Sequence, residues 1–598
     1  MKFNSFLLWG TGFSLLLTGC IDDKYDLSDI DTTSEFKINN LVLPVNLDPV
    51  TLDDIITVEE GDQLKKVTIN GKTFYAVEQS GTFESDDIEV NRFAAEPSPL
   101  NANEVTFTLS SKAPANRNGR KADGNFKEYF NLEKVYEPLE YEANDIDPSV
   151  RGLSYMYFTN VDFILNIRAL NPDNLSSTLE NVGIILPKGL KITDVKANGY
   201  TFNPTDYRAS EGLLTIKNIN IVDNAADIVI TANAIDLSYY PSAFRFNADK
   251  NVGEFNLDSE FSIKEGCRLV MSGAAQQLAS LGDELKYSVN YGISRLEATS
   301  ILGEIQYNLE GTGLNLDPIS LDNLPEFLAD DQTNLIITNP QIYLNLNNPV
   351  GQYGLSYQSS INISAFRTNS TEEFPLGTDI KVAGKEGSFN YMLASDPNAV
   401  EDIPAEYAGG LNKISYNRLG YILSGQGLPN SLDLKLVNPM IPCQKLTEPF
   451  ELGTKIPGMK GSYCFLAPLA LDGDSRIVYT KTKDGWWSED LADLTITELM
   501  LNATVSSTIP MSASLAVYPL DKDGHRIQGL EIIPVEIQAN EPGKNLTFLI
   551  KGEIRNLDGV FITATVYPDG SKETLTPTQT ITLENIKVTV SGNYTKKF

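Results

Sequence analysis

Apolar and polar residues alternate with a period near two along almost the whole chain, and this pattern constrains the fold more than any other feature. Side chains of a β-strand point alternately to its two faces, so the alternation is typical of strands that are buried on one side. Clear runs occupy residues 163–168, 343–347 and 432–436. The sequence therefore predicts a mainly β protein, with several antiparallel β-sandwich domains in tandem and a few short helices.

An Asn-Pro pair follows each of these runs: Asn171-Pro172, Asn348-Pro349 and Asn438-Pro439. Proline has no N–H to donate to a β-ladder and restricts the residue before it, so each pair is predicted to end its strand. The recurrence favours an internal repeat of sandwich domains. The alternative is that the Asn-Pro pair, which ends strands well, recurs by chance.

Hairpin turns are predicted where an Asn-Gly or Asp-Gly pair separates two strand-like runs, as at Asn70-Gly71 and Asp569-Gly570. Helices are predicted only at 273–285, which is rich in Ala, Gln and Leu, and at 322–329, which carries capping residues and an early proline.

A chain of 598 residues is too long for one hydrophobic core. Residues 110–125 accumulate Ser, Lys, Pro, Asn and Gly without apolar periodicity, which predicts a mobile loop. The predicted units are a signal peptide at 1–19, an acidic tether at 20–35, an N-terminal β domain at 36–150 containing that loop, β-sandwich domains at 151–300 and 301–414, a β domain at 415–492 and a C-terminal β-sandwich at 493–598.

The first twenty residues have the character of a leader. Lys2 supplies a positive start, residues 6–17 form an apolar run, and Leu17-Thr18-Gly19-Cys20 closes it with small residues before a cysteine. The run is shorter than the ~20 residues that a membrane span needs. This arrangement resembles a bacterial lipoprotein signal. The resemblance implies cleavage before Cys20 and acylation of Cys20, with palmitate among the chains, so that the protein is lipid-anchored.

Carboxylates follow the cysteine at Asp22, Asp23 and Asp26. They resemble the acidic export signals of surface lipoproteins from gut Gram-negative anaerobes. With its leader and β-rich body, the chain is similar to the large uncharacterised outer-membrane and surface lipoproteins of these Bacteroidota-type bacteria. The resemblance implies an outer-membrane location facing the cell surface. The alternative is that 20–35 is only a solvated tether, which leaves the leaflet open.

The formal net charge is −32, from 79 acidic and 47 basic side chains. Such a field repels phosphate backbones, which excludes nucleic acid as a main partner. It also disfavours contact with an anionic leaflet, so the body is predicted to stand off the membrane.

Three cysteines follow Cys20. In an oxidising envelope Cys443 and Cys464 could form a disulfide that stabilises the fold by about 3 kcal/mol, with Cys267 left over. We favour the alternative, in which all three are small buried residues in strands, because extracellular disulfide scaffolds normally carry more cysteines. The sequence has no Cys/His cluster for a metal and no phosphate or dinucleotide loop, so no metal site or cofactor is predicted.

Motifs for catalysis are equally scarce. His525 is the single histidine and follows the Asp523-Gly524 turn, which is poorly suited to hold a catalytic base. Asp472-Gly473-Asp474 and 521–524 are predicted to be turns rather than calcium sites. We assign no catalytic residue. A glycoside hydrolase with two facing carboxylates stays an alternative, because sequence spacing cannot show such a pair in a β protein.

Trp486 and Trp487 are the most suggestive local feature, since they are adjacent and stand among carboxylates. In a strand one would face the core and the other solvent, where it could contact a sugar or a protein partner. The alternative is that both rings order a loop or fill hydrophobic cores.

These features together predict a lipid-anchored outer-membrane protein with a non-catalytic binding or structural role. The alternatives are a glycan-binding accessory of a nutrient-import system, a subunit of an outer-membrane assembly or transport complex, and the glycoside hydrolase. The predicted partners are the membrane, through the anchor, and either an outer-membrane protein or a glycan.

Overall fold

The computed structural model describes residues 33–44, 49–56, 58, 63–111, 126–171, 175–309, 318–321, 333–426, 428–485, 487 and 493–597. Strands make up 64% and helices 5%, which confirms the mainly β prediction. The described part contains the one-turn α-helices α1 (Leu52–Ile55), α2 (Ala275–Leu278) and α4 (Ala405–Ala408), and the 3-10 turns η1 (Pro204–Asp206), η2 (Leu237–Tyr239), η3 (Gly351–Tyr353) and η4 (Leu419–Tyr421). The predicted helix at 273–285 is therefore only α2, and the one at 322–329 lies outside the described residues.

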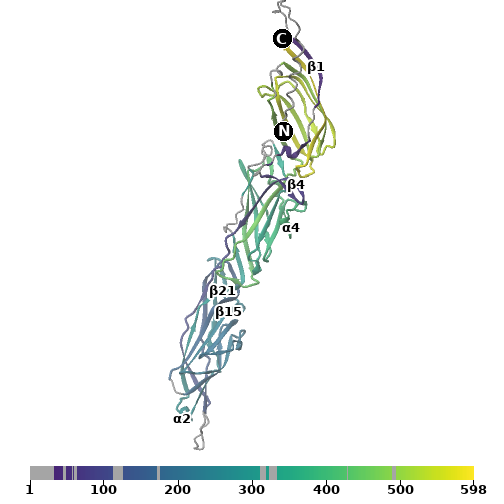
Figure 1. Ribbon diagram of the computed structural model, residues 1–598. Coiled ribbons are helices and arrows are strands. Elements are labelled where there is room, and N and C mark those ends of the chain that lie inside the picture. Colours follow the sequence, from purple (N-terminus) through teal and green to yellow (C-terminus); the bar gives the residue numbers. More distant parts are fainter. Residues whose placement is uncertain are drawn as a thin grey trace, which may run out of the picture.

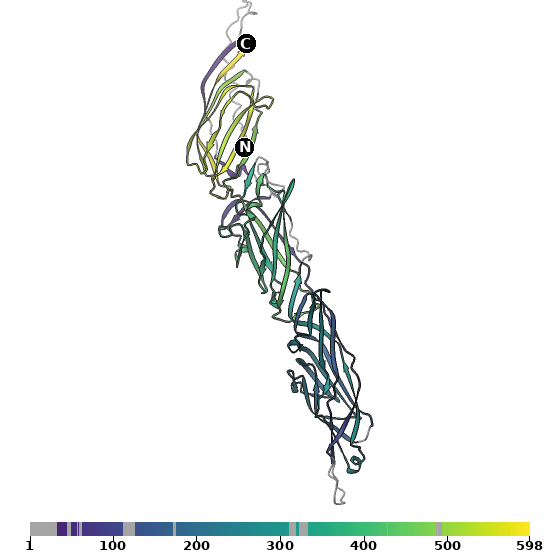
Figure 2. The ribbon, with the colours of Figure 1, turned by 180° about the vertical axis from the view of Figure 1, so that it is seen from behind.

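Three β-rich bodies are stacked end to end in an elongated molecule (Figure 1), and the view from behind shows the same stack (Figure 2). We call them the terminal, middle and distal bodies. The terminal body holds β1 beside the C-terminal strands, whereas α2 marks the far end of the distal body (Figure 1).

The terminal body consists of β1 (Thr33–Pro44), β2 (Val50–Thr51), β34 (Ile477–Lys483), β35 (Leu494–Ser507), β36 (Met511–Asp521), β37 (Glu531–Ile533), β38 (Val535–Ile537), β39 (Lys544–Arg555), β40 (Leu557–Pro568) and β41 (Thr580–Lys597). They form two sheets, in the orders β1-β41-β35-β39-β37 and β34-β40-β36-β38, and β2 also pairs with β41.

The middle body consists of β3 (Leu64–Ile69), β4 (Lys72–Glu84), β22 (Ile319–Ser320), β23 (Asn334–Ile336), β24 (Gln341–Asn347), β25 (Tyr357–Arg367), β26 (Ser370–Pro375), β27 (Ile380–Val382), β28 (Ser388–Ala394), β29 (Asn412–Ser415), β30 (Ser424–Gln426), β31 (Ser431–Lys445), β32 (Phe450–Glu451) and β33 (Lys460–Pro468). One of its sheets runs β29-β28-β24-β33-β4-β3.

The distal body consists of β5 (Ala94–Pro97), β6 (Asn103–Ser111), β7 (Phe126–Leu132), β8 (Pro138–Ile146), β9 (Val150–Ala169), β10 (Ser176–Ile185), β11 (Leu190–Ala197), β12 (Tyr200–Phe202), β13 (Tyr207–Arg208), β14 (Leu213–Asn220), β15 (Ala225–Asp236), β16 (Phe244–Asn247), β17 (Val252–Glu260), β18 (Ser262–Ile263), β19 (Arg268–Gly273), β20 (Glu284–Ile293) and β21 (Leu296–Asn308). Of the predicted mobile loop, residues 112–125 lie outside the described residues.

The chain path is nested. It starts in the terminal body, passes through the middle body, builds the whole distal body, and then returns through the middle body to end where it began. Thr33 is accordingly the register partner of Lys597. Both described ends of the chain therefore lie in one body at one end of the molecule.

This path corrects the predicted linear domains. The predicted 36–150 domain is divided among all three bodies, because β1 pairs with β41, β4 pairs with β33, and β6 pairs with β20. The predicted domains at 301–414 and 415–492 share one body, since β25 pairs with β31. The terminal body contains 493–598 together with β1, β2 and β34.

A shared strand joins the distal and middle bodies. β21 pairs with β9 of the distal body over residues 298–305, and it also pairs with β32 at residues 300–301 and with β31 at residues 304–308, both in the middle body. The carbonyl of Gly303 on β21 accepts the backbone N–H of Leu446, which follows β31 of the middle body, at 2.9 Å. One buried apolar cluster includes residues of both bodies. The joint is thus built like a protein interior rather than a linker.

The alternation seen in the sequence is realised in the core strands. On β9, Phe163, Leu165 and Ile167 are buried while the residues between them are half-exposed. Likewise Asn70 and Gly71 both adopt positive φ between β3 and β4, as a two-residue hairpin turn requires.

The three Asn-Pro pairs are not structural equivalents. β24 ends at Asn347 and β9 ends at Ala169, as predicted. The third pair does not end a strand, because β31 continues to Lys445 through a register shift at Asn438, which has φ 50°. Asn348 differs again: it is buried, and its amide donates to the carbonyls of Leu355 and Ala383.

Candidate functional site

A groove of about 860 Å³ lies where the middle and terminal bodies meet. Its volume falls in the range of about 300–1,000 Å³ that is typical of ligand sites. The walls are built from the start of β4, residues 336–341, residues 395–402, the η4 region, residues 468–472 and residues 572–576. The nested chain path brings these distant segments together.

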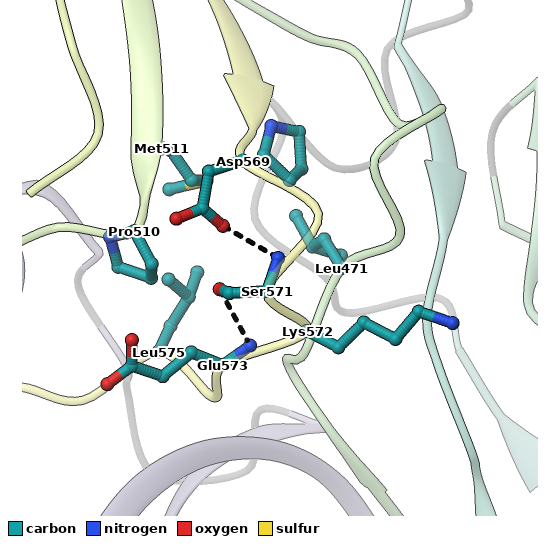
Figure 3. A pocket seen from close by; sticks show the side chains of 9 residues that line it. Leu471, Pro510, Met511, Asp569, Ser571, Lys572, Glu573 and Leu575 are labelled. Atoms are coloured by element: carbon teal, nitrogen blue, oxygen red, sulfur yellow. Dashed lines mark hydrogen bonds between the residues drawn. The ribbon is translucent and has the colours of Figure 1, made fainter.

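The loop at 569–575 fixes the terminal body to the middle body. Asp569 Oδ1 accepts the backbone N–H of Ser571 at 2.9 Å, and Ser571 Oγ accepts that of Glu573 at 3.3 Å (Figure 3). The loop ends at the buried Leu575, whose N–H donates to Leu469 and whose carbonyl accepts the N–H of Tyr75, both at 3.0 Å. Two backbone hydrogen bonds of Leu575 therefore join this loop of the terminal body to the middle body.

Lys572 connects this loop to the groove. It has φ 59°, and its side chain extends away from the small pocket that Pro510 and Met511 line (Figure 3). Its Nζ lies 3.2 Å from Asp472 Oδ2. The backbone N–H of Asp474 and this ammonium hold the pKa of the Asp472 carboxyl below its usual value.

The groove lining includes a polar group that is largely withdrawn from solvent. Gln341 is only 6% exposed and stands near the buried Phe74 and Ile337, which also line the groove. Its Oε1 accepts the hydroxyl of Tyr343 at 2.7 Å. Its amide nitrogen donates to no atom in the part of the chain that the structure describes.

The charged side chains around the groove are mostly acidic. Lys72 pairs with Asp402 at 3.3 Å, and Lys572 pairs with Asp472 as described above. The lining carries five carboxylates against two lysines, a formal net charge of −3; the other three carboxylates are Asp396, Glu401 and Glu573. The electrostatic character therefore disfavours anionic ligands.

Tyr421 presents an aromatic ring at the groove, with 66% of the residue exposed. It ends η4, which is held by the buried Leu419 and Ile422 on either side of it. The N–H of Gly420 donates to Ser395 Oγ at 2.7 Å, and the carbonyl of Tyr421 accepts the hydroxyl of Ser424 at 2.7 Å. A fixed backbone thus carries a solvent-facing ring.

Of the two tryptophans predicted to contact a ligand or partner, the structure describes one. Trp486, like Cys20, lies outside the described residues. Trp487 is 40% exposed, and its backbone N–H donates to Asp558 Oδ1 at 2.8 Å. It lies beyond the end of β34, so the alternation of strand faces does not apply to it. It does not line the groove.

The three cysteines of the described part are free thiols. Cys443 is exposed on β31, and Cys464 is buried on β33 of a different sheet, so the structure does not join them in the possible disulfide. The favoured alternative of three buried thiols in strands fits Cys464 but not Cys443, which is exposed. Cys267 is also buried. Burial raises the pKa of Cys267 to about 12 and that of Cys464 to about 11.

We expect a thiol reagent to report this arrangement in the Cys20→Ala variant. Folded protein should release one equivalent of chromophore, from Cys443, because the two other thiols are buried and protonated. Unfolding in denaturant should raise the count to three. A count of one in denaturant would mean that Cys443 and Cys464 are bonded.

The other polar motifs form exposed turns. His525 has 79% of its side chain exposed, and its N–H donates to Asp521 Oδ1 at 2.9 Å. Asp472 Oδ1 likewise accepts the N–H of Asp474 at 3.3 Å. Within the described ranges no group of three or more His, Cys, Asp and Glu residues is placed to hold a metal ion.

Sequence reasoning missed the groove residues. Tyr421 is one of 26 tyrosines, and only its position after Leu419-Gly420, in a break between strand-like runs, hints at exposure. Gln341 stands at the start of a strand whose apolar pattern it does not disturb. Neither carries a motif, because the groove forms only when the chain returns to the middle body.

Comparison with known proteins adds little. No family model and no curated protein matches the chain. Among solved structures, a crystal structure described as "a putative secreted protein from Parabacteroides distasonis" is similar at 16% sequence identity, over 49% of this chain and 89% of that one, with a TM-score of 0.33. In the described ranges, none of the helices has the length and apolar character that a membrane crossing requires.

Proposed function

We propose that this protein is a lipid-anchored outer-membrane protein that faces the cell surface and has a non-catalytic binding role. The nested chain path carries the proposal. Thr33, the described residue nearest to Cys20, pairs with Lys597 in the terminal body, while the distal body lies at the far end of the molecule (Figure 1). An anchor at Cys20 would therefore attach the molecule by one end.

Attachment by one end suits presentation away from the bilayer. Each methylene of an acyl chain that enters the bilayer contributes about 0.8 kcal/mol, so two or more chains retain a large body. The net charge of −32 opposes contact with an anionic leaflet. The groove, at the joint next to the anchored body, would remain open to solvent.

The groove chemistry favours binding over catalysis. Each lysine that lines it is already paired with a carboxylate, and the single histidine lies in a turn that does not line it. What the groove offers is an exposed ring, carboxylate acceptors and amides. These groups can orient a ligand through stacking and hydrogen bonds.

Replacing Cys20 with alanine tests the anchor. We expect the variant to leave the detergent phase and the outer-membrane fraction, because no acyl chain can be attached. Cys443→Ala is the matched control, since it removes another exposed thiol and should fractionate like the wild type. Retention of the Cys20→Ala protein in outer membranes would contradict the proposal.

A separate experiment, protease treatment of intact cells, shows which leaflet the wild-type protein faces.

A further inference from the structure

We propose that the groove between the middle and terminal bodies binds a short segment of a neutral oligosaccharide. The inference deepens the proposed binding role by naming its ligand class. Three features carry it: the exposed ring of Tyr421, the amide nitrogen of the buried Gln341, which donates no hydrogen bond among the described residues, and the balance of charges along the walls.

Tyr421 supplies a stacking platform. A side chain with 66% exposure contributes little to the core, yet its backbone is held by the buried residues of η4 and by the hydrogen bond from Gly420 to Ser395. An aromatic ring combines a flat apolar face with a polar hydroxyl edge. The C–H face of a sugar ring matches that flat surface, and sugar hydroxyls match the edge.

The polar groups that line the same groove include both donors and acceptors. Among the described residues, the amide nitrogens of Gln341 and Asn417 donate no hydrogen bond, although Asn417 Oδ1 accepts the hydroxyl of Ser415 at 2.9 Å. Asp396 and Glu401 present carboxylate acceptors in the same groove. Sugar hydroxyls both donate and accept, so they can satisfy the two kinds of group at once.

The charges along the groove further restrict the class of ligand that can bind. The formal charge of −3 and the pairing of both lysines disfavour phosphorylated or acidic sugars. A basic peptide could pair its lysine and arginine side chains with the carboxylates. Those side chains are hydrogen-bond donors only, so just the backbone carbonyls of the peptide could accept from the Gln341 amide. A neutral hydroxylated ligand uses all of these groups and adds no charge to neutralise.

Calorimetry on the detergent-purified full-length protein tests the inference. The probes are maltohexaose, cellohexaose, xylohexaose and mannohexaose, with oligogalacturonate and hexalysine as charged comparisons. We expect at least one neutral hexaose to bind. Tyr421→Ala should weaken that binding by about tenfold or more, whereas Tyr421→Phe, which keeps the ring, should weaken it by less than about threefold.

Tyr200→Ala is the matched control, because Tyr200 is also 66% exposed but lies in the distal body, away from the groove. It should bind like the wild type, and melting curves should show all three variants folded. The inference is wrong if none of the neutral hexaoses binds, if hexalysine alone binds, or if the Tyr421→Ala and Tyr200→Ala variants lose affinity equally. Anchoring is measured separately through Cys20, so failure of one claim leaves the other standing.

Discussion

The Phe163→Ala variant should lose about 3 to 5 kcal/mol of unfolding free energy, which is enough to disrupt the distal body. Phe163 is fully buried on β9 and packs edge-to-face on Phe261, with ring centroids 5.7 Å apart. Phe261 packs in turn on Tyr291 at 5.2 Å. Truncation removes apolar burial and leaves a cavity between rigid sheets that cannot close around it.

Phe366→Ala provides the control for this measurement. Phe366 lies on β25 of the middle body and is 38% exposed, so its truncation should cost much less and leave no enclosed cavity. Denaturant unfolding followed by tyrosine fluorescence and circular dichroism would give both values. Equal destabilisation of the two variants would mean that the distal core is not packed as described.

The sequence contained enough information to predict the strands themselves. The period-two pattern at 163–168 depends only on which face of one strand is buried, and β9 buries the predicted residues. Hairpin turns such as Asn70-Gly71 are similarly local, because they depend on positive φ at two adjacent residues.

Domain organisation was not predictable in the same way. The partner of Asn40 is Ser591, 551 positions away in the sequence, and nothing in β1 specifies so distant a neighbour. A linear division assigned β1 to the strands that follow it. Strand pairing is decided by the whole set of edges and faces, so a nested path leaves no trace in local patterns.

The candidate site shows the same limit. The sequence singles out Trp486 and Trp487 because tryptophan is rare in this chain, yet Trp487, the one that the structure describes, lies outside the groove. Tyr421 and Gln341 are common residue types without a motif. They line one groove only because separate segments of the middle body converge at the joint with the terminal body.

The arrangement of the two ends also has a large predicted effect on distance to the membrane. His525, which has 79% of its side chain exposed, follows β36, and β36 runs from the joint toward the end of the molecule that holds Thr33 and Lys597. Tyr200 lies in the distal body, beside the half of β15 that pairs with the end of β9. Position 525 is therefore close to an anchor at Cys20, and position 200 is far from it.

Energy transfer from a dye on the protein to acceptor lipids in the bilayer measures these two distances. In the Cys443→Ser background, which removes the exposed native thiol, a donor dye is attached to His525→Cys or to Tyr200→Cys, and the lipidated protein is placed in liposomes that contain an acceptor lipid. We expect strong transfer from position 525 and little or none from position 200. Equal transfer from both positions, or stronger transfer from position 200, would contradict a molecule attached at its terminal body with its distal body held away from the membrane.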